Sequence, residues 1–187
     1  MRVSRIQAAE NRQTVINVAS RLFRERGFDG IGLKDLMEGA GLTQGAFYKQ
    51  FESKEDLAAQ ASRRALESAS QGWSTAIAEN PDDPLGAVIA CHREEKLDGC
   101  PVVALGSDAA RQGAGVKAAF EEGIKAYLEV LGPLLSQTDG EDTTGRAMVV
   151  LSTMVGAMTL SRAVNDPDLA QAFQNAAVEH VREAAAA

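Results

Sequence analysis

The segment GLTQGAFYKQFESKEDL, residues 41–57, places three aromatic side chains within five positions: Phe47, Tyr48 and Phe51. Gly45 stands just before them, and the turn-like pair Glu52-Ser53 follows. A buried core helix disfavours glycine, and a surface loop disfavours a run of aromatic side chains. The segment therefore predicts a short helix that is anchored by aromatic side chains on one face and has a small residue in its first turn.

The neighbouring residues predict helices on both sides of this segment. Residues 7–26 carry apolar side chains at helical spacing and end at Gly27, a residue typical of helix C-termini. Residues 33–40 predict a helix of about two turns. Thr43 is placed to cap the helix predicted over 44–51, with its hydroxyl accepting from a free amide. Ser53, followed three residues later by Asp56, predicts the start of a long helix over 54–80.

Two short helices joined by a glycine-containing turn, followed by a longer helix, predict a helix-turn-helix. In this motif the second helix lies in the DNA major groove, and its N-terminal residues reach base edges. Phe47 and Phe51 are four residues apart and are expected to pack inward. The small residues Gly45 and Ala46 suit a first turn that comes close to the DNA backbone.

The composition predicts an all-α fold. The chain has 187 residues, of which 45% are apolar and only 5% aromatic, and alanine is abundant in its second half. Such a composition favours helices packed through small side chains over sheets of β-branched and aromatic residues. No segment shows the alternation of a half-buried strand.

The chain resembles no secreted or membrane protein. Its first residues are basic and polar, unlike a signal peptide, and its apolar runs are shorter than a membrane span. Its two cysteines are too few for a disulfide framework. We therefore expect a soluble, cytoplasmic protein.

Charge is distributed unevenly along the sequence, which has a net charge of −7. Residues 1–64 hold eleven Lys or Arg against eight Asp or Glu, whereas residues 65–187 hold eight against eighteen. The mildly basic N-terminal part is compatible with phosphate contact, particularly if a dimer presents two such parts.

Residues 19–57 resemble the tetracycline-repressor (TetR) family of transcriptional regulators. The resemblance lies in the end of the first helix (Phe23 to Phe28), the turn and second short helix (Gly41 to Tyr48), Phe51, and the segment Ser53 to Leu57. Two positions depart from the family pattern: Ile31-Gly32 replaces a turn that usually holds Thr or Ser, and Gln50 stands where relatives often have His.

The resemblance implies a DNA-binding domain over residues 1–57 and a helical effector-binding and dimerisation domain over 58–187. It implies a homodimeric repressor that releases operator DNA when a small-molecule effector binds, with no catalysis, cofactor or metal. The expected DNA contacts are Lys34, Thr43, Gln44, Gly45, Ala46, Tyr48, Lys49 and Lys54. Among these, the Gln44 amide can pair with adenine, whereas Tyr48, Lys49 and Lys54 are expected to hold phosphates.

The rest of the chain also predicts helices, over 84–97, from 101, over 116–135 and 143–164, and after Pro167. The last two are rich in small residues, and the resemblance implies that they pair with a second copy as a four-helix bundle. Four side chains of the 143–164 helix fit either this interface or the core of one copy: Ala147, Leu151, Met154 and Met158.

An effector pocket is expected between these helices, with mostly apolar walls. The candidate wall residues are Trp73, His92, Cys100, Phe120, Tyr127, Met148 and Met154, each of which also fits an ordinary core position.

Cys100 precedes Pro101 and is expected to be a helix N-cap, where free amides and the helix dipole stabilise a thiolate. Repression controlled by oxidants or electrophiles through Cys100, with Cys91 as a second thiol, is therefore an alternative. Burial of both cysteines as small core residues is the simpler explanation. A cysteine-dependent enzyme is a further alternative, for which only His92 and His180 are available as bases.

Overall fold

The computed structural model describes residues 5–93, 99–136 and 142–186, and these contain helices and no strands, as predicted. In chain order the helices are α1 (Arg5–Arg26), α2 (Leu33–Gly39), α3 (Gln44–Phe47), α4 (Lys54–Glu79), α5 (Pro84–Arg93), α6 (Pro101–Ala109), α7 (Ala114–Leu134), α8 (Thr144–Ala163) and α9 (Pro167–Ala186). The predicted helix over 84–97 is described only as far as Arg93, and its last residues lie outside the described ranges.

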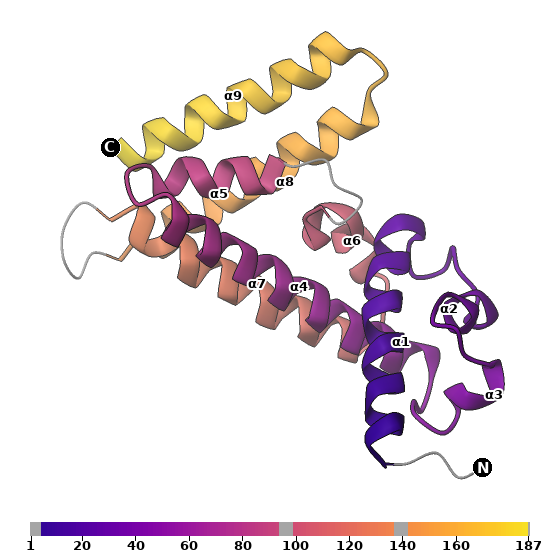
Figure 1. The fold of residues 1–187 in the computed structure, drawn as a ribbon. Helices are drawn as coiled ribbons and strands as arrows, with labels where there is room; N and C mark the ends of the chain where they lie inside the picture. The colour runs from indigo at the N-terminus through magenta and orange to yellow at the C-terminus, as the bar shows by residue number, and fades with distance from the viewer. Residues whose placement is uncertain (1–4, 94–98, 137–141, 187) are drawn as a thin grey trace.

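The first three helices form one end of the molecule, with α2 and α3 on the same side of α1 (Figure 1). Helix α1 buries Val15, Ile16, Ala19 and Phe23, which recur at helical spacing. Gly27 ends α1 with a φ of 75°, and its amide donates to the Phe23 carbonyl at 2.7 Å. Because this left-handed conformation favours glycine, Gly27 is the C-terminal cap that the sequence predicted.

Helix α3 is shorter than the helix predicted over 44–51. The amides of Gln50 and Phe51 both donate to the Phe47 carbonyl, at 2.8 and 3.0 Å, so the chain tightens into a turn after the first four residues. This turn brings Phe51 into the core. Thr43 is the N-cap residue of α3, but its side chain makes no capping hydrogen bond, so that part of the prediction was wrong.

Helix α4 begins as the sequence predicted. Ser53 is its N-cap, and the Ser53 hydroxyl accepts a hydrogen bond from the Asp56 amide at 3.0 Å. The Asp56 carboxylate in turn accepts from the Glu52 amide at 3.2 Å. These reciprocal bonds fix the direction in which α4 leaves the N-terminal helices.

Helices α4 and α7 run side by side and form the most extensive helix pair of the fold (Figure 1). Gly123 of α7 makes this close approach possible, because a Cβ atom there would lie 2.6 Å from Leu66 Cβ of α4. The side chains between the two helices include Leu66, Trp73 and Tyr127, all of which are buried.

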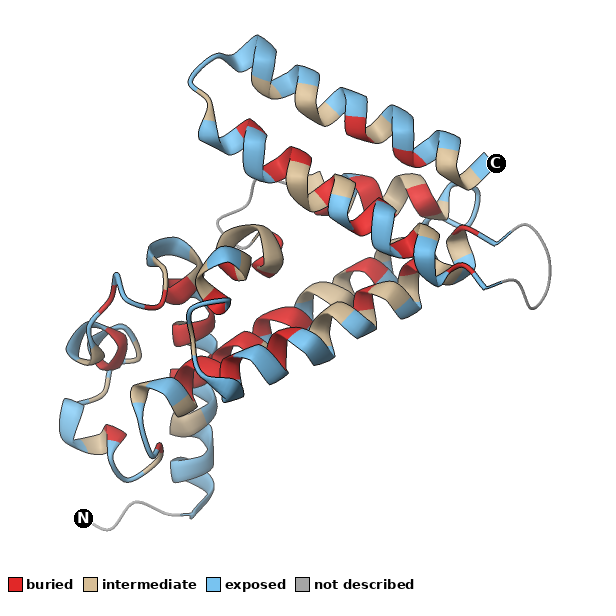
Figure 2. Cartoon of the chain, turned by 180° about the vertical axis from the view of Figure 1, so that it is seen from behind, coloured by how far each residue is buried: buried red, intermediate tan, exposed pale blue. Residues whose placement is uncertain are grey.

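Helices α8 and α9 pack against each other at the end of the molecule opposite α3 (Figure 1). Most of α9 is exposed, and only Ala177 and Val181 are fully buried in it (Figure 2). The four α8 residues that fitted either an interface or a core, Ala147, Leu151, Met154 and Met158, are all buried within the single chain.

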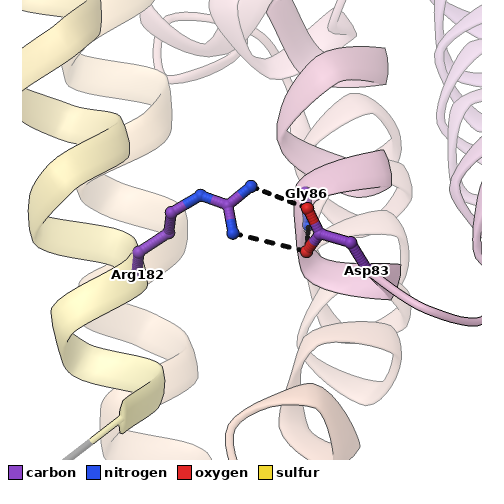
Figure 3. Close-up of polar contacts among 3 residues, drawn as sticks. All are labelled: Asp83, Gly86 and Arg182. Carbon is purple, nitrogen blue, oxygen red and sulfur yellow. Dashed lines mark hydrogen bonds and ion pairs between the residues drawn. The ribbon is translucent and has the colours of Figure 1, made fainter.

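An exposed ion pair joins α9 to the residue just before α5. Arg182 of α9 contacts both carboxylate oxygens of Asp83, at 3.3 and 2.8 Å (Figure 3). Asp83 also accepts a hydrogen bond from the Gly86 amide at 2.9 Å, in the first turn of α5. The arginine and this amide hold the pKa of the Asp83 carboxyl below its ordinary value.

One continuous apolar cluster extends through the chain, from Val15 and Phe47 near the N-terminus to Trp73, Met154 and Val181. None of the helices over the described ranges is both long enough and apolar enough to cross a membrane.

Candidate DNA-reading face and effector cavity

Two aromatic side chains, Phe47 of α3 and Phe51 just after it, attach α3 to the core of the N-terminal helices. Phe47 and Phe51 are almost completely buried, and their rings stack with centroids 5.4 Å apart. The Arg12 guanidinium lies 5.0 Å from the centre of the Phe51 ring and donates to Gln60 of α4 at 2.5 Å. These contacts attach α3 to both α1 and α4, so its orientation follows theirs.

The opposite side of α3 is open to solvent. Of the residues expected to contact DNA, Thr43, Gln44, Gly45, Tyr48 and Lys49 are exposed, and Ala46 is half-buried. A Cβ atom added to Gly45 would meet no atom of the chain within 4 Å. The first turn of α3 is therefore accessible to a large flat or grooved partner.

The two remaining lysines differ from each other. Lys34 of α2 is exposed, and its ammonium lies 3.7 Å from Glu38 in a weak ion pair. Lys54 is half-buried, and its ammonium donates to the Phe28 carbonyl at 2.6 Å. Lys54 therefore ties the start of α4 to the turn after α1, a structural contact that the sequence did not suggest.

A cavity of about 390 Å³ lies beside α4, and residues of α1, α5 and α7 and the start of α6 complete its walls. Four of the predicted pocket residues line it together: Trp73, His92, Cys100 and Tyr127. Its volume is within the range of small-molecule sites. Arg24, Ala65, Ser68, Ala69, Gly72, Cys91 and Gly99 form the rest of the wall.

Three of the predicted pocket residues do not line this cavity. Phe120 is buried in the core, and Met154 lines a much smaller space between α5, α8 and α9. Met148 is 50% exposed in the single chain and does not line this cavity. Apolar side chains occur on every side of helix α8, and Met148 belongs to the side that faces solvent in the single chain.

Aromatic side chains dominate one wall of the cavity. The rings of Trp73 and Tyr127 stack with centroids 4.4 Å apart, and His92 meets the Trp73 ring edge-on at 5.9 Å. Burial lowers the pKa of His92 to about 4, outweighing the nearby Met154 carbonyl, which favours the protonated ring. His92 is therefore neutral at physiological pH.

Neither polar side chain of this wall makes a hydrogen bond of ordinary geometry within the described parts of the chain. The Tyr127 hydroxyl and both ring nitrogens of His92 are buried and have no partner of ordinary geometry there. Burial, followed by the nearby Cys100 sulfur, raises the pKa of Tyr127, which therefore stays protonated. Buried polar groups normally find partners, so these three atoms are suited to a bound molecule.

Cys100 is the N-cap residue of α6, as the sequence predicted. The expected stabilisation of its thiolate was wrong. The sulfur is buried, and burial raises the pKa of the thiol above its ordinary value. The nearby amides of Val102 and Val103 act in the opposite direction but do not outweigh the loss of solvent.

Two features of the cavity were missed from the sequence. Ala65, Ser68, Ala69 and Gly72 recur on one side of α4, and this stripe of small side chains leaves the space that the cavity occupies. That spacing was readable in advance. Arg24 of α1 gave no such signal, because it reaches the cavity only through the fold, where its guanidinium lies 3.5 Å from the Gly99 carbonyl.

Comparison with known proteins agrees with this architecture. Residues 15–61 match the family of bacterial regulatory proteins described as the tetR family. The regulator LmrA of Bacillus subtilis is 27% identical over 163 residues, which cover 81% of this chain and 86% of LmrA. The regulator AcrR of Shigella flexneri is 39% identical over 56 residues, which cover 30% of this chain and 26% of AcrR.

Solved structures share the fold over nearly the whole chain. A TetR-family regulator from Cytophaga hutchinsonii superposes with a TM-score of 0.79 at 20% identity, covering 100% of this chain and 97% of that one. The reduced form of E. coli NemR gives 0.73 at 18% identity, covering 90% and 95%. The match of residues 15–61 and the fold shared over the whole chain support a transcriptional regulator of the TetR family.

Proposed function

We propose that the protein is a homodimeric repressor that reads operator DNA through the first turn of α3 and releases it when a small molecule fills the cavity beside α4. Residues 1–57 serve as the DNA-binding part and residues 58–187 as the effector-binding and dimerisation part, without catalysis. The observation that carries the proposal is the contrast within α3, where Phe47 is buried while Gln44 and Gly45 are exposed.

The residues proposed to contact DNA have different roles. Gln44 reads a base edge, since its amide can pair bidentately with adenine. Tyr48 and Lys49 contact phosphates, and Lys34 and Lys54 add positive charge at the rim. Lys54 retains two N–H groups beyond the one bonded to Phe28, so its structural contact is compatible with a phosphate contact.

Dimerisation occurs through α8 and α9. Four large apolar side chains are exposed on these helices, Met148, Val149, Leu160 and Leu169, at 44–53%. Apolar side chains gathered on one pair of helices are typical of a surface that another protein covers. A two-fold axis at this surface would present two α3 helices to a palindromic site.

The cavity is placed to influence α3 because its walls include parts of both α1 and α4. Arg24 of α1 is a wall residue and donates to the Ser20 and Gly99 carbonyls. Helix α6 touches the end of α1 as well, since a Cβ atom on Gly27 would lie 2.7 Å from Asp108. A ligand that shifts α6 or α4 therefore changes the position of α1 and, through it, of α3.

Two variants of exposed residues test the DNA-reading face. Gln44→Ala should weaken binding to the preferred sequence by about 1–3 kcal/mol and relax preference at one base pair. Lys49→Ala should weaken binding to all sequences and reduce the slope of log affinity against log salt concentration by about 1, the effect of one lost phosphate contact. Fluorescence anisotropy with specific and scrambled duplexes at two salt concentrations separates these effects. Equal loss of sequence preference in both variants would contradict the assignment of Gln44 to a base and of Lys49 to a phosphate.

Release of DNA through a thiol is the second candidate, because Cys91 and Cys100 line the same cavity. Burial disfavours the reactive thiolate of Cys100, so we rank this candidate below reversible binding. Treatment with diamide decides between them: loss of DNA binding in the wild type but not in Cys100→Ser would establish the thiol switch. DNA binding that survives the treatment in both proteins leaves reversible ligand binding as the mechanism.

A further inference from the structure

We infer that the cavity beside α4 binds an uncharged, flat aromatic molecule whose hydroxyl group forms hydrogen bonds with Tyr127 and His92. This inference rests on the proposed effector role of the cavity and names the chemistry of its ligand. It follows from three properties of the wall: its aromatic stack, its buried unsatisfied polar atoms, and the neutral state of both polar side chains.

The aromatic stack favours a flat ligand. Trp73 and Tyr127 lie with an interplanar angle of 24°, and the small side chains of Ala65, Ala69 and Gly72 line the same space. Aromatic pairs prefer stacked or edge-to-face arrangements, so a flat ring extends this wall with little loss of conformational entropy. About 390 Å³ is sufficient for a molecule of two fused rings.

The unsatisfied polar atoms define the ligand's functional group. Tyr127 is 0% exposed and His92 is 3% exposed, and neither side chain makes a hydrogen bond of ordinary geometry in the described ranges, although the Cys100 sulfur lies near the Tyr127 hydroxyl and the Met154 carbonyl near the His92 ring. A neutral imidazole offers one donor and one acceptor, and a phenol offers a donor and lone pairs. A ligand hydroxyl matches this pair because it can accept from the Tyr127 hydroxyl and donate to a His92 nitrogen.

Electrostatics favour a neutral ligand at this wall. Burial keeps the His92 ring uncharged above about pH 4 and keeps the Tyr127 hydroxyl protonated. An ionised ligand group placed against these two side chains would lose its hydration, and neither side chain carries an opposite charge. The Arg24 guanidinium lines the same cavity and its charge acts on Tyr127, but it already donates to the Ser20 and Gly99 carbonyls.

Compounds that share one carbon frame test the inference. Isothermal titration calorimetry on the DNA-free protein should show 1-naphthol binding at least tenfold more tightly than naphthalene or 1-naphthoate. Tyr127→Phe removes only the hydroxyl and should weaken 1-naphthol binding by about fivefold to tenfold, the effect of one lost hydrogen bond. Because that hydroxyl is unsatisfied in the free protein, the variant should fold normally.

The matched control is Tyr48→Phe, the same change at the other tyrosine of the chain, which is 69% exposed on α3. It should leave 1-naphthol binding unchanged. Tighter binding of 1-naphthoate than of 1-naphthol, equal affinities in wild type and Tyr127→Phe, or absence of binding by all three compounds would each overturn the inference.

The same proteins distinguish failure of this inference from failure of the proposed function. DNA binding is measured separately by anisotropy without ligand, where Tyr127→Phe should behave as the wild type. Intact DNA binding together with no preference for 1-naphthol overturns the ligand class alone. Normal binding of 1-naphthol by a protein that binds no DNA overturns the regulatory role and leaves the ligand class standing.

Discussion

Replacement of Gly45 by alanine separates the stability of the protein from its binding of DNA. Gly45 is the second residue of α3, it is exposed, and an added Cβ atom would meet nothing within 4 Å. Its φ angle is not positive, so the backbone accepts an alanine without strain. The glycine is therefore not required by the fold of the single chain.

The expected effect on folding is small and favourable. Alanine is preferred over glycine in helices by up to about 1 kcal/mol, and less in a first turn. We expect the free energy of unfolding of Gly45→Ala, measured by urea titration, to equal that of the wild type or to exceed it by about 0.5 kcal/mol.

The expected effect on DNA binding is large and unfavourable. If the first turn of α3 lies against DNA, the added methyl group enters a packed interface, where an excess methyl group costs about 1–3 kcal/mol. This corresponds to roughly fivefold to 150-fold weaker binding. Fluorescence anisotropy with operator DNA gives this ratio directly.

Gly145→Ala is the matched control. Gly145 is also the second residue of its helix, α8, and an added Cβ atom there also meets nothing within 4 Å. Helices α8 and α9 form the end of the molecule opposite α3 (Figure 1). We expect unchanged DNA binding in Gly145→Ala, measured where sedimentation shows that the variant is still a dimer, since α8 belongs to the proposed dimer surface. Wild-type affinity in Gly45→Ala, or equal losses in both variants, would refute the assignment of the α3 first turn to the DNA.

Three further changes test the packing, the buried histidine and the dimer. Gly123→Ala should lower the unfolding free energy by about 1–2 kcal/mol, because the new Cβ atom would lie within 3 Å of three Leu66 atoms. Gly115→Ala, on the same helix, is the control and should not lower it, because its new Cβ atom would lie at an ordinary 3.4 Å from Ala59 Cβ. The pKa of His92 is lowered to about 4 in the folded protein, so the imidazole of the unfolded chain is protonated first as the pH falls. Between pH 7 and pH 5 the unfolding free energy of the wild type should therefore fall by about 2 kcal/mol more than that of His92→Gln. Equal falls in the two proteins, measured by urea titration at both pH values, would argue against a neutral buried imidazole. Leu160→Glu, at a side chain that is 48% exposed, should convert the dimer to a folded monomer in sedimentation and weaken operator binding at least tenfold, and a dimer that persists would place the interface elsewhere.

The N-terminal helices were predictable because their signals are local. The Ser53–Asp56 cap, the glycine at the end of α1 and the spacing of Phe47 and Phe51 all act within one or two turns of chain. Such local hydrogen bonds and steric preferences can be inferred without knowing what packs against them.

The far end of the chain was less predictable because burial there depends on neighbouring helices. Apolar side chains occur on every side of helix α8, so its sequence does not indicate that Ala147 faces the core while the adjacent Met148 faces outward. Cys100 illustrates the same limit: its position before Pro101 predicted the N-cap, but the depth of burial that raises its pKa is a tertiary property.

Selection of bound sequences from a pool of randomised duplex DNA tests the central claim most directly. The account predicts enrichment of an inverted repeat whose two half-sites are read by the two copies of α3, together with loss of preference at one position of each half-site when Gln44→Ala is used. A pool that shows no enriched sequence, or an enriched sequence unaffected by changes to Gln44, Gly45 and Lys49, would contradict the claim that α3 reads DNA.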